Sequence, residues 1–309
     1  MTTYLPDPRM PSDGPRERMD LTVLYRGPLT SCNYDCGYCP FAKAHDSPET
    51  LAADRAALRR FTDWALTQAE HRLTILITPW GEALTRSWYR DAMVELSHCD
   101  HVARVAVQTN AAVRMGWTER ADLDRLALWT TYHPDEVAHE VFVAKSLELT
   151  RRGVRHSVGV VGLPEHLDAA RALRGSLPPE TYVWVNAAEG HTYDDDEAAQ
   201  WAAIDPLFSW SRRPHPSRGR PCSAGRDAVT VDGVGDVRRC HFLPQDGPGA
   251  VLGSIHDGSY LDGLRERACP AAACDCHIGY VHLDHLGLRD AFAGGLAERI
   301  PAAWPPRPM

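Results

Sequence analysis

The sequence lacks several features that would place the protein in a membrane or on nucleic acid. It contains no apolar run long enough to span a bilayer, and residues 1–20 are polar and proline-rich, with no signal-peptide core. It also lacks an excess of basic residues, since the formal net charge of the 309-residue chain is −8. We therefore expect a cytoplasmic protein with a flexible leader over residues 1–20, binding neither nucleic acid nor a membrane.

Structural disulfides are rare in a reducing cytoplasm, so the nine cysteines need another explanation. Eight of them lie in two groups, one near the start of the chain and one in its last third, and Cys99 stands alone as an expected core residue. Grouped thiols in such a compartment are typical of metal or redox sites.

The first group is Cys32, Cys36 and Cys39, in a C-x-x-x-C-x-x-C array between a strand-like run and a helix. A [4Fe-4S] cluster normally takes four thiolates, so three would leave one iron open to a substrate or cofactor. Structural zinc sites instead favour paired C-x-x-C knuckles and a closed shell. A buried or disulfide-bonded group of thiols is the alternative.

The order of apolar runs and amphipathic segments predicts six strand–helix units. The strands are expected at 21–25, 73–77, 102–107, 126–131, 154–161 and 182–186, and the helices at 47–70, 87–97, 117–123, 135–151, 167–173 and 194–204. This alternation indicates an α/β fold of parallel βαβ units. Six units are too few to close an eight-stranded barrel, so we expect a partial (β/α)6 TIM-like barrel with its site at the C-terminal ends of the strands.

Polar residues or glycines follow the predicted strands at those ends. They are Gly81, Glu82, Asn110, Thr131, His133 and Asn186. Taken singly, most could be capping or turn residues, and His133 could be a buried, hydrogen-bonded histidine. Their common position favours a shared binding site.

The second cysteine group follows an Arg- and Pro-rich stretch, residues 211–221, that has the composition of a linker. Its arginines could alternatively hold a substrate carboxylate or phosphate. Cys222 and Cys240 flank a predicted β-hairpin over 228–240, and Cys269, Cys274 and Cys276 follow. These thiols are candidate metal ligands, with structural zinc or simple core cysteines as alternatives. An apolar helix is expected over 286–300.

The first array, with Tyr38 directly before its last cysteine, resembles the signature of the radical S-adenosylmethionine (SAM) enzymes. The resemblance implies that Cys32, Cys36 and Cys39 hold a [4Fe-4S] cluster whose fourth iron binds the amino and carboxylate groups of SAM. One electron then splits SAM into methionine and a 5′-deoxyadenosyl radical. A flavodoxin- or ferredoxin-type electron donor is implied as a partner.

Two strand ends extend this resemblance. Residues 78–83 are similar to the family's G-G-E-P turn, in which Gly81 and Glu82 match while Trp80 and Ala83 replace the first glycine and the proline. In the family, this turn receives the SAM amino group. Residues 160–165 are similar to the adenine-side motif I-x-G-x-x-E.

The resemblance also implies roles for residues around the nucleoside. Tyr38, Val160 and Gly162 would line the adenine, and Asn186 would lie where main-chain groups contact it. Asn110 and Thr131 would face the ribose or the substrate.

The segment from Cys222 through Gly235 to Cys240 resembles the first half of the SPASM or twitch extension of these enzymes. The full SPASM array needs more cysteines for its two clusters, so a small twitch-like β-hairpin domain with one auxiliary [4Fe-4S] cluster fits better. Its ligands would be Cys222, Cys240 and two of the three later cysteines. The expected organisation is a leader (1–20), a barrel (21–210), a linker (211–221), the twitch-like domain (222–285) and a C-terminal helix and tail (286–309).

These features predict a radical SAM oxidoreductase that abstracts hydrogen from a substrate. Because twitch and SPASM relatives often modify peptides, a peptide or protein side chain is the first expectation. The sequence has no added peptide-recognition domain, so a partner would deliver such a substrate. A small metabolite is the alternative. A non-enzymatic iron–sulfur or zinc protein is a third possibility, but it would leave the strand-end motifs unexplained.

Overall fold

The computed structural model describes residues 18–41, 44–243 and 251–305. The predicted leader therefore lies almost wholly outside the described residues. Among the described residues, no helix combines the length and apolar character needed to cross a membrane.

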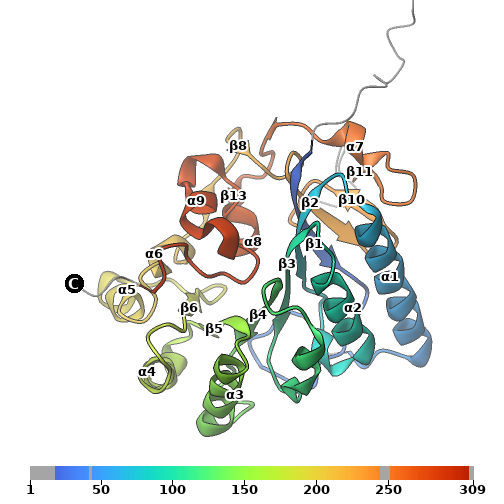
Figure 1. Cartoon of the computed structure of the whole chain (residues 1–309). Helices are drawn as coiled ribbons and strands as arrows, with labels where there is room; N and C mark the ends of the chain where they lie inside the picture. The colour runs from blue at the N-terminus through green and yellow to red at the C-terminus, as the bar shows by residue number, and fades with distance from the viewer. Residues whose placement is uncertain (1–17, 42–43, 244–250, 306–309) are drawn as a thin grey trace, which may run out of the picture.

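Six parallel strands form the centre of the fold and pair in chain order. They are β1 (Asp20–Arg26), β2 (Arg72–Ile77), β3 (Val102–Thr109), β4 (Leu126–Thr131), β5 (Arg155–Val161) and β6 (Val183–Asn186). Each lies within two residues of a strand expected from the apolar runs. The curved sheet confirms the predicted partial (β/α)6 barrel (Figure 1).

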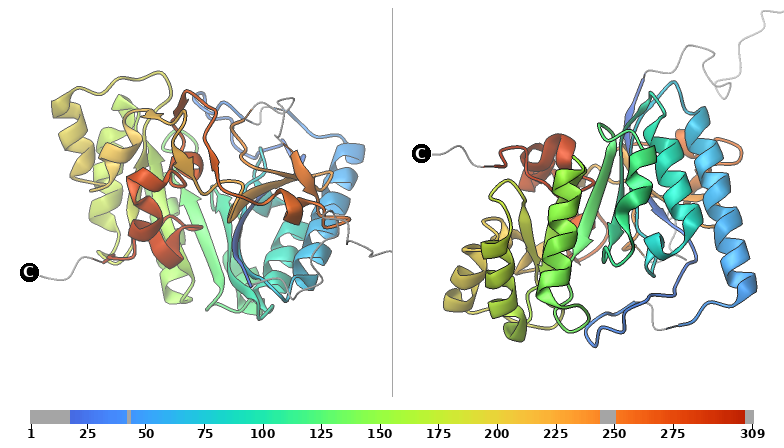
Figure 2. Two further views of the ribbon diagram at one scale, coloured as in Figure 1. Left: turned by 90° about the horizontal axis from the view of Figure 1, so that it is seen from above. Right: turned by 60° about the horizontal axis from the view of Figure 1, so that its bottom comes forward.

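The helices that follow these strands pack on the outer face of the sheet (Figures 1 and 2). They are α1 (Pro48–Thr67), α2 (Ser87–Ser97), α3 (His139–Arg151), α4 (Leu167–Ser176), α5 (Asp195–Ala202) and α6 (Phe208–Ser211). The Ser47 hydroxyl caps α1 by accepting a hydrogen bond from the Thr50 amide, as Ser followed by Pro at the first helical position predicts.

Two helix predictions need correction. The helix expected over 117–123 is a 3-10 helix at Met115–Arg120. The helix expected from residue 135 begins only at His139, because a turn forms first, with the Glu136 amide donating to the His133 carbonyl. Pro134 favours an extended conformation at the preceding residue, which delays the helix.

Side chains alternate along the strands between two apolar layers. Ile75, Val105 and Leu128 point outward into the core beneath the helices. Leu76, Trp129 and Trp184 point inward and form a second cluster. Strand periodicity therefore gives the barrel an apolar inner layer.

The hairpin predicted after Cys222 joins the barrel sheet. β9 (Ala228–Asp232) pairs in parallel with β1, and β10 (Asp236–Arg238) and β11 (Val251–Ser254) continue the sheet beyond it. Strand β1 would otherwise expose unpaired backbone groups at an edge, and the hairpin satisfies them.

The rest of the C-terminal segment is built from short elements. They are β7 (His215–Pro216), β8 (Pro221–Cys222), α7 (Tyr260–Gly263), β12 (Arg267–Ala268), β13 (Ala273–Cys274), α8 (His277–Tyr280) and α9 (Leu288–Phe292). Figure 2 shows α8 and α9 in red on the opposite side of the sheet from α1 and α2. There Ile278, Ala297 and Ile300 pack on the inner apolar layer.

The single apolar helix expected over 286–300 is wrong. Only α9 is α-helical there, because Gly287 before it and Ala293 after it have positive φ angles of 64° and 37°. Gly294 and Gly295 then favour the 3-10 turn Ala293–Gly295 over a continuing helix.

Candidate active site

A polar layer lies directly above the apolar inner layer. The inward-facing apolar residues of the first four strands are Leu24, Leu76, Ala106 and Trp129. Two positions after each of them, on the same face, the sequence has Arg26, Thr78, Gln108 and Thr131. The Thr78 hydroxyl donates to the Gln108 Oε1 atom at 2.7 Å. The change from apolar to polar marks the C-terminal ends of the strands, where barrel enzymes place their sites.

A cavity of about 160 Å³ opens at this layer. Its walls include Cys32, Cys36, Cys39, Gly81, Glu82, Asn110, Thr131 and His133. The structure therefore brings the first cysteine array and several predicted strand-end residues to one place.

Glu82 is held rigidly in the cavity wall. It is 5% exposed. Its Oε1 atom accepts hydrogen bonds from the Thr109 hydroxyl at 2.6 Å and the Leu84 amide at 3.0 Å, and its Oε2 atom accepts from the Asn110 amide at 2.7 Å. Burial raises the pKa of the Glu82 carboxyl, while these hydrogen bonds lower it. Since a carboxylate has about four acceptor positions, one stays available for a ligand.

Gly81 lets the turn after β2 approach the cysteine loop. A Cβ atom at this position would lie 2.1 Å from the Ser31 carbonyl oxygen. The Gly81 amide donates to the Leu29 carbonyl at 3.0 Å, and the Glu82 amide donates to the Ser31 carbonyl at 3.1 Å. The second strand end is thus fixed against the loop that carries the cysteines.

Two aspartates that sequence reasoning missed also hold this loop. The Asp46 carboxylate accepts from the Thr30 amide, the Thr30 hydroxyl and the Ser31 amide, at 2.6 to 2.9 Å. The Asp54 carboxylate, on α1 and 0% exposed, accepts from the Leu29 amide at 3.1 Å. An aspartate among the apolar positions of a predicted helix is the only sequence signal that could have singled out Asp54.

His133 links the fourth strand end to the cysteine loop. Its Nδ1 atom lies 3.2 Å from the Cys36 sulfur and 2.8 Å from the Tyr38 hydroxyl. Burial lowers the pKa of His133 to about 4, so the ring is neutral near pH 7. Tyr38 also packs edge-on against His166, at 5.1 Å between ring centres.

The three thiols suit an iron–sulfur cluster better than a single metal ion. In the described part of the chain, no three His, Cys, Asp or Glu side chains converge well enough to share one ion. A cluster, however, binds each thiolate at a different iron, so its ligands line a wall. Burial raises the pKa of Cys36 to about 12, so cluster binding would release protons. The donor set and the cavity fit a three-thiolate cluster.

The residues predicted to contact adenine are not among the walls of this cavity. The Val160 side chain is buried in the outer core, so only its backbone could reach a ligand. The Gly162 amide donates to the Asn186 carbonyl at 2.7 Å, which joins the ends of β5 and β6. The Asn186 side chain lies 3.4 Å from Arg299. The roles of Val160, Gly162, Asn186 and Tyr38 in adenine binding stay predictions.

Four of the five later cysteines meet at a second, separate pocket. Cys222, Cys240, Cys269 and Cys274 line a space of about 30 Å³, room for roughly two water molecules. Burial raises the pKa of Cys240 to about 11. Four thiols fit a four-thiolate site by donor type.

Cys276 does not line the four-thiol pocket. Its charged neighbours are Arg299 and Arg26, and Arg26 lines the first cavity. Cys276 therefore lies outside the pocket walls, although it is near enough to Cys274 to raise the pKa of that thiol. The arginines of 211–221 are not in the walls of either cavity, and Arg212 forms an ion pair with Asp195 at 3.0 Å.

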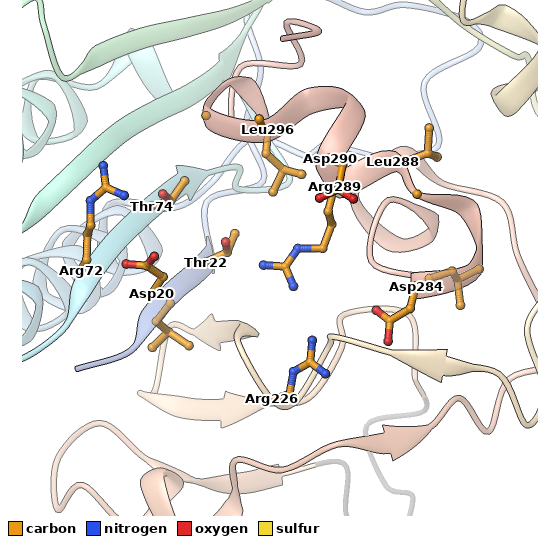
Figure 3. A pocket seen from close by; sticks show the side chains of 15 residues that line it. Asp20, Thr22, Arg72, Thr74, Arg226, Asp284, Leu288, Arg289, Asp290 and Leu296 are labelled. Atoms are coloured by element: carbon orange, nitrogen blue, oxygen red, sulfur yellow. The ribbon is translucent and has the colours of Figure 1, made fainter. Parts of the chain in front are cut away.

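A larger cavity of about 490 Å³ lies at the opposite ends of the strands (Figure 3). Thr22 and Thr74, near the starts of β1 and β2, form one side, and the C-terminal segment forms the other. None of the nine cysteines lines it. The larger of the two cavities is therefore not the one that holds the candidate active-site residues.

Comparison with known proteins links this arrangement to solved structures. No protein-family model and no curated protein matches the sequence. The structure of anSMEcpe with bound S-adenosylmethionine aligns with a TM-score of 0.52 at 12% identity, covering 79% of this chain and 83% of that one. The chain has the fold of the radical SAM enzymes.

A second structure of anSMEcpe, with S-adenosylmethionine and the Cp18Cys peptide bound, gives the same TM-score of 0.52 at 12% identity. It covers 79% of this chain and 82% of that one. The radical SAM resemblance in the sequence is confirmed at the level of the fold. Which ligands the protein binds and which reaction it catalyses must be argued from the residues of the site.

Proposed function

We propose that the protein is a radical SAM enzyme that reductively cleaves SAM and abstracts a hydrogen atom from a substrate. The observation that carries this proposal is the single cavity shared by Cys32, Cys36, Cys39, Gly81 and Glu82 at the C-terminal ends of the strands. The radical SAM fold supports it. When bound, a [4Fe-4S] cluster and SAM would supply the 5′-deoxyadenosyl radical.

The residues of this chain bind and position these groups. Cys32, Cys36 and Cys39 would hold the cluster through their sulfur atoms. Glu82 has one acceptor position free and would receive the SAM ammonium group by a charge-assisted hydrogen bond. Because the fold already orders this carboxylate with three donors, binding would cost little side-chain entropy.

His133 lines the cavity, and the apolar inner layer lies beneath the polar layer. His133 is uncharged near pH 7 and contacts both Cys36 and Tyr38, so it orients the loop without adding charge. The inner apolar layer with Trp129 and Trp184 lies below the polar layer that lines the cavity. Such a floor protects a reactive radical from solvent.

For the substrate, we propose a peptide or protein side chain, with a small metabolite as the alternative. One anSMEcpe structure contains a peptide in addition to S-adenosylmethionine, which supports the first choice. An electron donor of the flavodoxin or ferredoxin type would supply the reducing equivalent.

The four-thiol pocket of Cys222, Cys240, Cys269 and Cys274 is proposed to hold the auxiliary cluster. A structural zinc ion is the alternative that the sequence leaves open, but the four thiols would have to move closer together to share one ion. Either group would fix the C-terminal segment beside the barrel.

The proposed function is tested by anaerobic reconstitution with iron and sulfide, reduction with dithionite, and chromatographic assay for 5′-deoxyadenosine formed from SAM. Wild-type protein should form this product, and Cys32→Ala should not. A fully loaded wild-type protein that forms none would overturn the proposal. Cys99→Ala is the matched control, because Cys99 lies outside both cysteine groups.

A further inference from the structure

Arg26 is an unpaired cation inside the candidate active site. It ends β1 and lines the same cavity as the three cysteines, with 8% of its surface exposed. Its Nε atom is buried without a hydrogen-bond partner, and the guanidinium forms no ion pair with any residue in the described ranges. Burying an unpaired charge is costly, so such a group points to a missing partner.

The protein contacts of Arg26 orient the guanidinium without neutralising it. Its central carbon lies 4.2 Å from the Trp80 ring centre and 5.8 Å from that of Phe41. Stacking on an aromatic face stabilises the guanidinium and leaves the edge of the fork free for hydrogen bonds. Burial lowers the pKa of Arg26 only to about 10, so the side chain stays charged near pH 7.

The neighbouring titratable groups do not supply the missing negative charge. Glu82 is the only acidic residue in the described walls of the cavity, and three donors already bind it.

Two arginines of the larger cavity, Arg226 and Arg289, give the contrast. There Arg289 pairs with Asp227 at 2.8 Å, and Arg226 pairs with Asp227 at 3.3 Å. Figure 3 shows both guanidinium groups directed into that cavity. Their charges are already matched by the fold, whereas that of Arg26 is not.

We propose that Arg26 binds a carboxylate of a molecule held in the active-site cavity. The inference rests on the proposed function, because that function supplies the molecules in question. The carboxylate could belong to SAM or to the substrate. Arg recognises this group by two parallel hydrogen bonds, a geometry that the stacked fork of Arg26 presents.

The first arm of the test measures SAM binding. Equilibrium dialysis on cluster-loaded protein would compare SAM with decarboxylated SAM in wild type, Arg26→Gln, Arg26→Lys and the exposed control Arg171→Gln. If SAM is the source, Arg26→Gln weakens SAM binding at least tenfold and leaves decarboxylated SAM unchanged. Arg26→Lys, which keeps the charge, should retain part of the affinity and shows that the effect is not misfolding.

The second arm uses probe acids on SAM-loaded protein. Calorimetric titration would compare acetate, succinate and benzoate with their amides. If a second molecule is the source, wild type and Arg171→Gln bind at least one acid tenfold more tightly than its amide, and Arg26→Gln loses this preference while SAM binding is unchanged.

The proposal is overturned if Arg26→Gln changes neither SAM affinity nor the preference for acids. These readouts do not depend on SAM cleavage. If wild type forms 5′-deoxyadenosine but Arg26→Gln alters neither SAM affinity nor the preference for acids, the carboxylate-binding role of Arg26 is wrong and the proposed function stands. If Arg26→Gln alters SAM affinity or the preference for acids but wild type forms no 5′-deoxyadenosine, the proposed function is wrong and the carboxylate-binding role of Arg26 stands.

Discussion

The Oε2 atom of Glu82 accepts a hydrogen bond from the Asn110 amide at 2.7 Å, which joins the ends of β2 and β3. The same carboxylate accepts from Thr109 and Leu84 through Oε1. One side chain therefore connects neighbouring strands and faces the cavity with its remaining acceptor position.

Replacing Glu82 with Gln should weaken SAM binding at least tenfold in the cluster-loaded protein. The substitution removes the negative charge that would meet the SAM ammonium group, and a charge-assisted hydrogen bond contributes about 1.5–3 kcal/mol. The Gln amide group would also face the Asn110 amide, so stability should fall by about 1–3 kcal/mol. Equilibrium dialysis and chemical denaturation measure the two effects.

Glu180→Gln is the control for Glu82→Gln, because it removes the same charge at an exposed position in the turn before β6. It should leave stability and SAM affinity within experimental error of wild type. Equal SAM affinity in both variants would remove Glu82 from the binding site.

Replacing Gly81 with Ala should destabilise the protein and disturb the cysteine loop. The added Cβ atom would lie 2.1 Å from the Ser31 carbonyl oxygen, and backbone cannot move aside as a flexible side chain can. Overpacking of this kind costs about 1–3 kcal/mol. We expect a lower melting temperature and less iron bound per chain after reconstitution.

Gly37→Ala is a matched control within the cysteine loop itself. A Cβ atom at Gly37 meets nothing within 4 Å, and Gly37 is not among the residues with positive φ. Its effect on stability should stay within about 0.5 kcal/mol. A Gly37→Ala variant as unstable as Gly81→Ala would show that the loop tolerates no added atom, contrary to the steric argument.

The strands and most helices could be predicted because their signals are local. Apolar alternation fixed the strands to within about two residues, and the Ser47-Pro48 pair marked the start of α1. The three cysteines carried their own spacing signal, and parallel strands necessarily bring their C-terminal ends to one edge. The position of Glu82 beside the cysteine loop follows from that topology.

The residues that the sequence did not reveal act through contacts distant along the chain. Asp54 reaches Leu29 across 25 positions, and Arg26 is informative only because its buried Nε atom has no hydrogen-bond partner among the described residues. The choice among Cys269, Cys274 and Cys276 depends on short strands, since β13 pairs with β7 and β12 pairs with β8. No periodicity encodes such pairings.

Replacing Asp54 with Ala should cost about 3–5 kcal/mol of stability. Its carboxylate is fully buried and accepts from the Leu29 amide, the Trp88 indole and the Tyr89 hydroxyl, at 2.8 to 3.1 Å. Removing it leaves three donors unsatisfied at the base of the cysteine loop. Chemical denaturation measures the change in the free energy of unfolding.

Asp63→Ala on the same helix is the control for Asp54→Ala. Asp63 pairs with Arg59 at 2.6 Å, but both side chains are about half exposed, at 64% and 46%. Exposed ion pairs contribute about 0–1 kcal/mol, so the loss should be small. Similar losses in the two variants would contradict the role of Asp54 as the buried anchor of the loop.

The four-thiol pocket predicts which of the later cysteines hold metal. In a background with Cys32, Cys36 and Cys39 replaced by Ala, only the second site can load, so its occupancy is read directly. Cys274→Ser should remove its metal because Cys274 lines the pocket, whereas Cys276→Ser should retain it because Cys276 lies toward Arg26 instead. Elemental analysis for iron and zinc, with visible absorption, measures occupancy and metal identity together.

Iron retained by Cys276→Ser and lost from Cys274→Ser fits an auxiliary cluster on Cys222, Cys240, Cys269 and Cys274. Zinc with the same pattern fits a structural ion on these thiols. Metal lost from Cys276→Ser but kept by Cys274→Ser would show that the C-terminal segment rearranges around Cys276 on loading, and would contradict this ligand set.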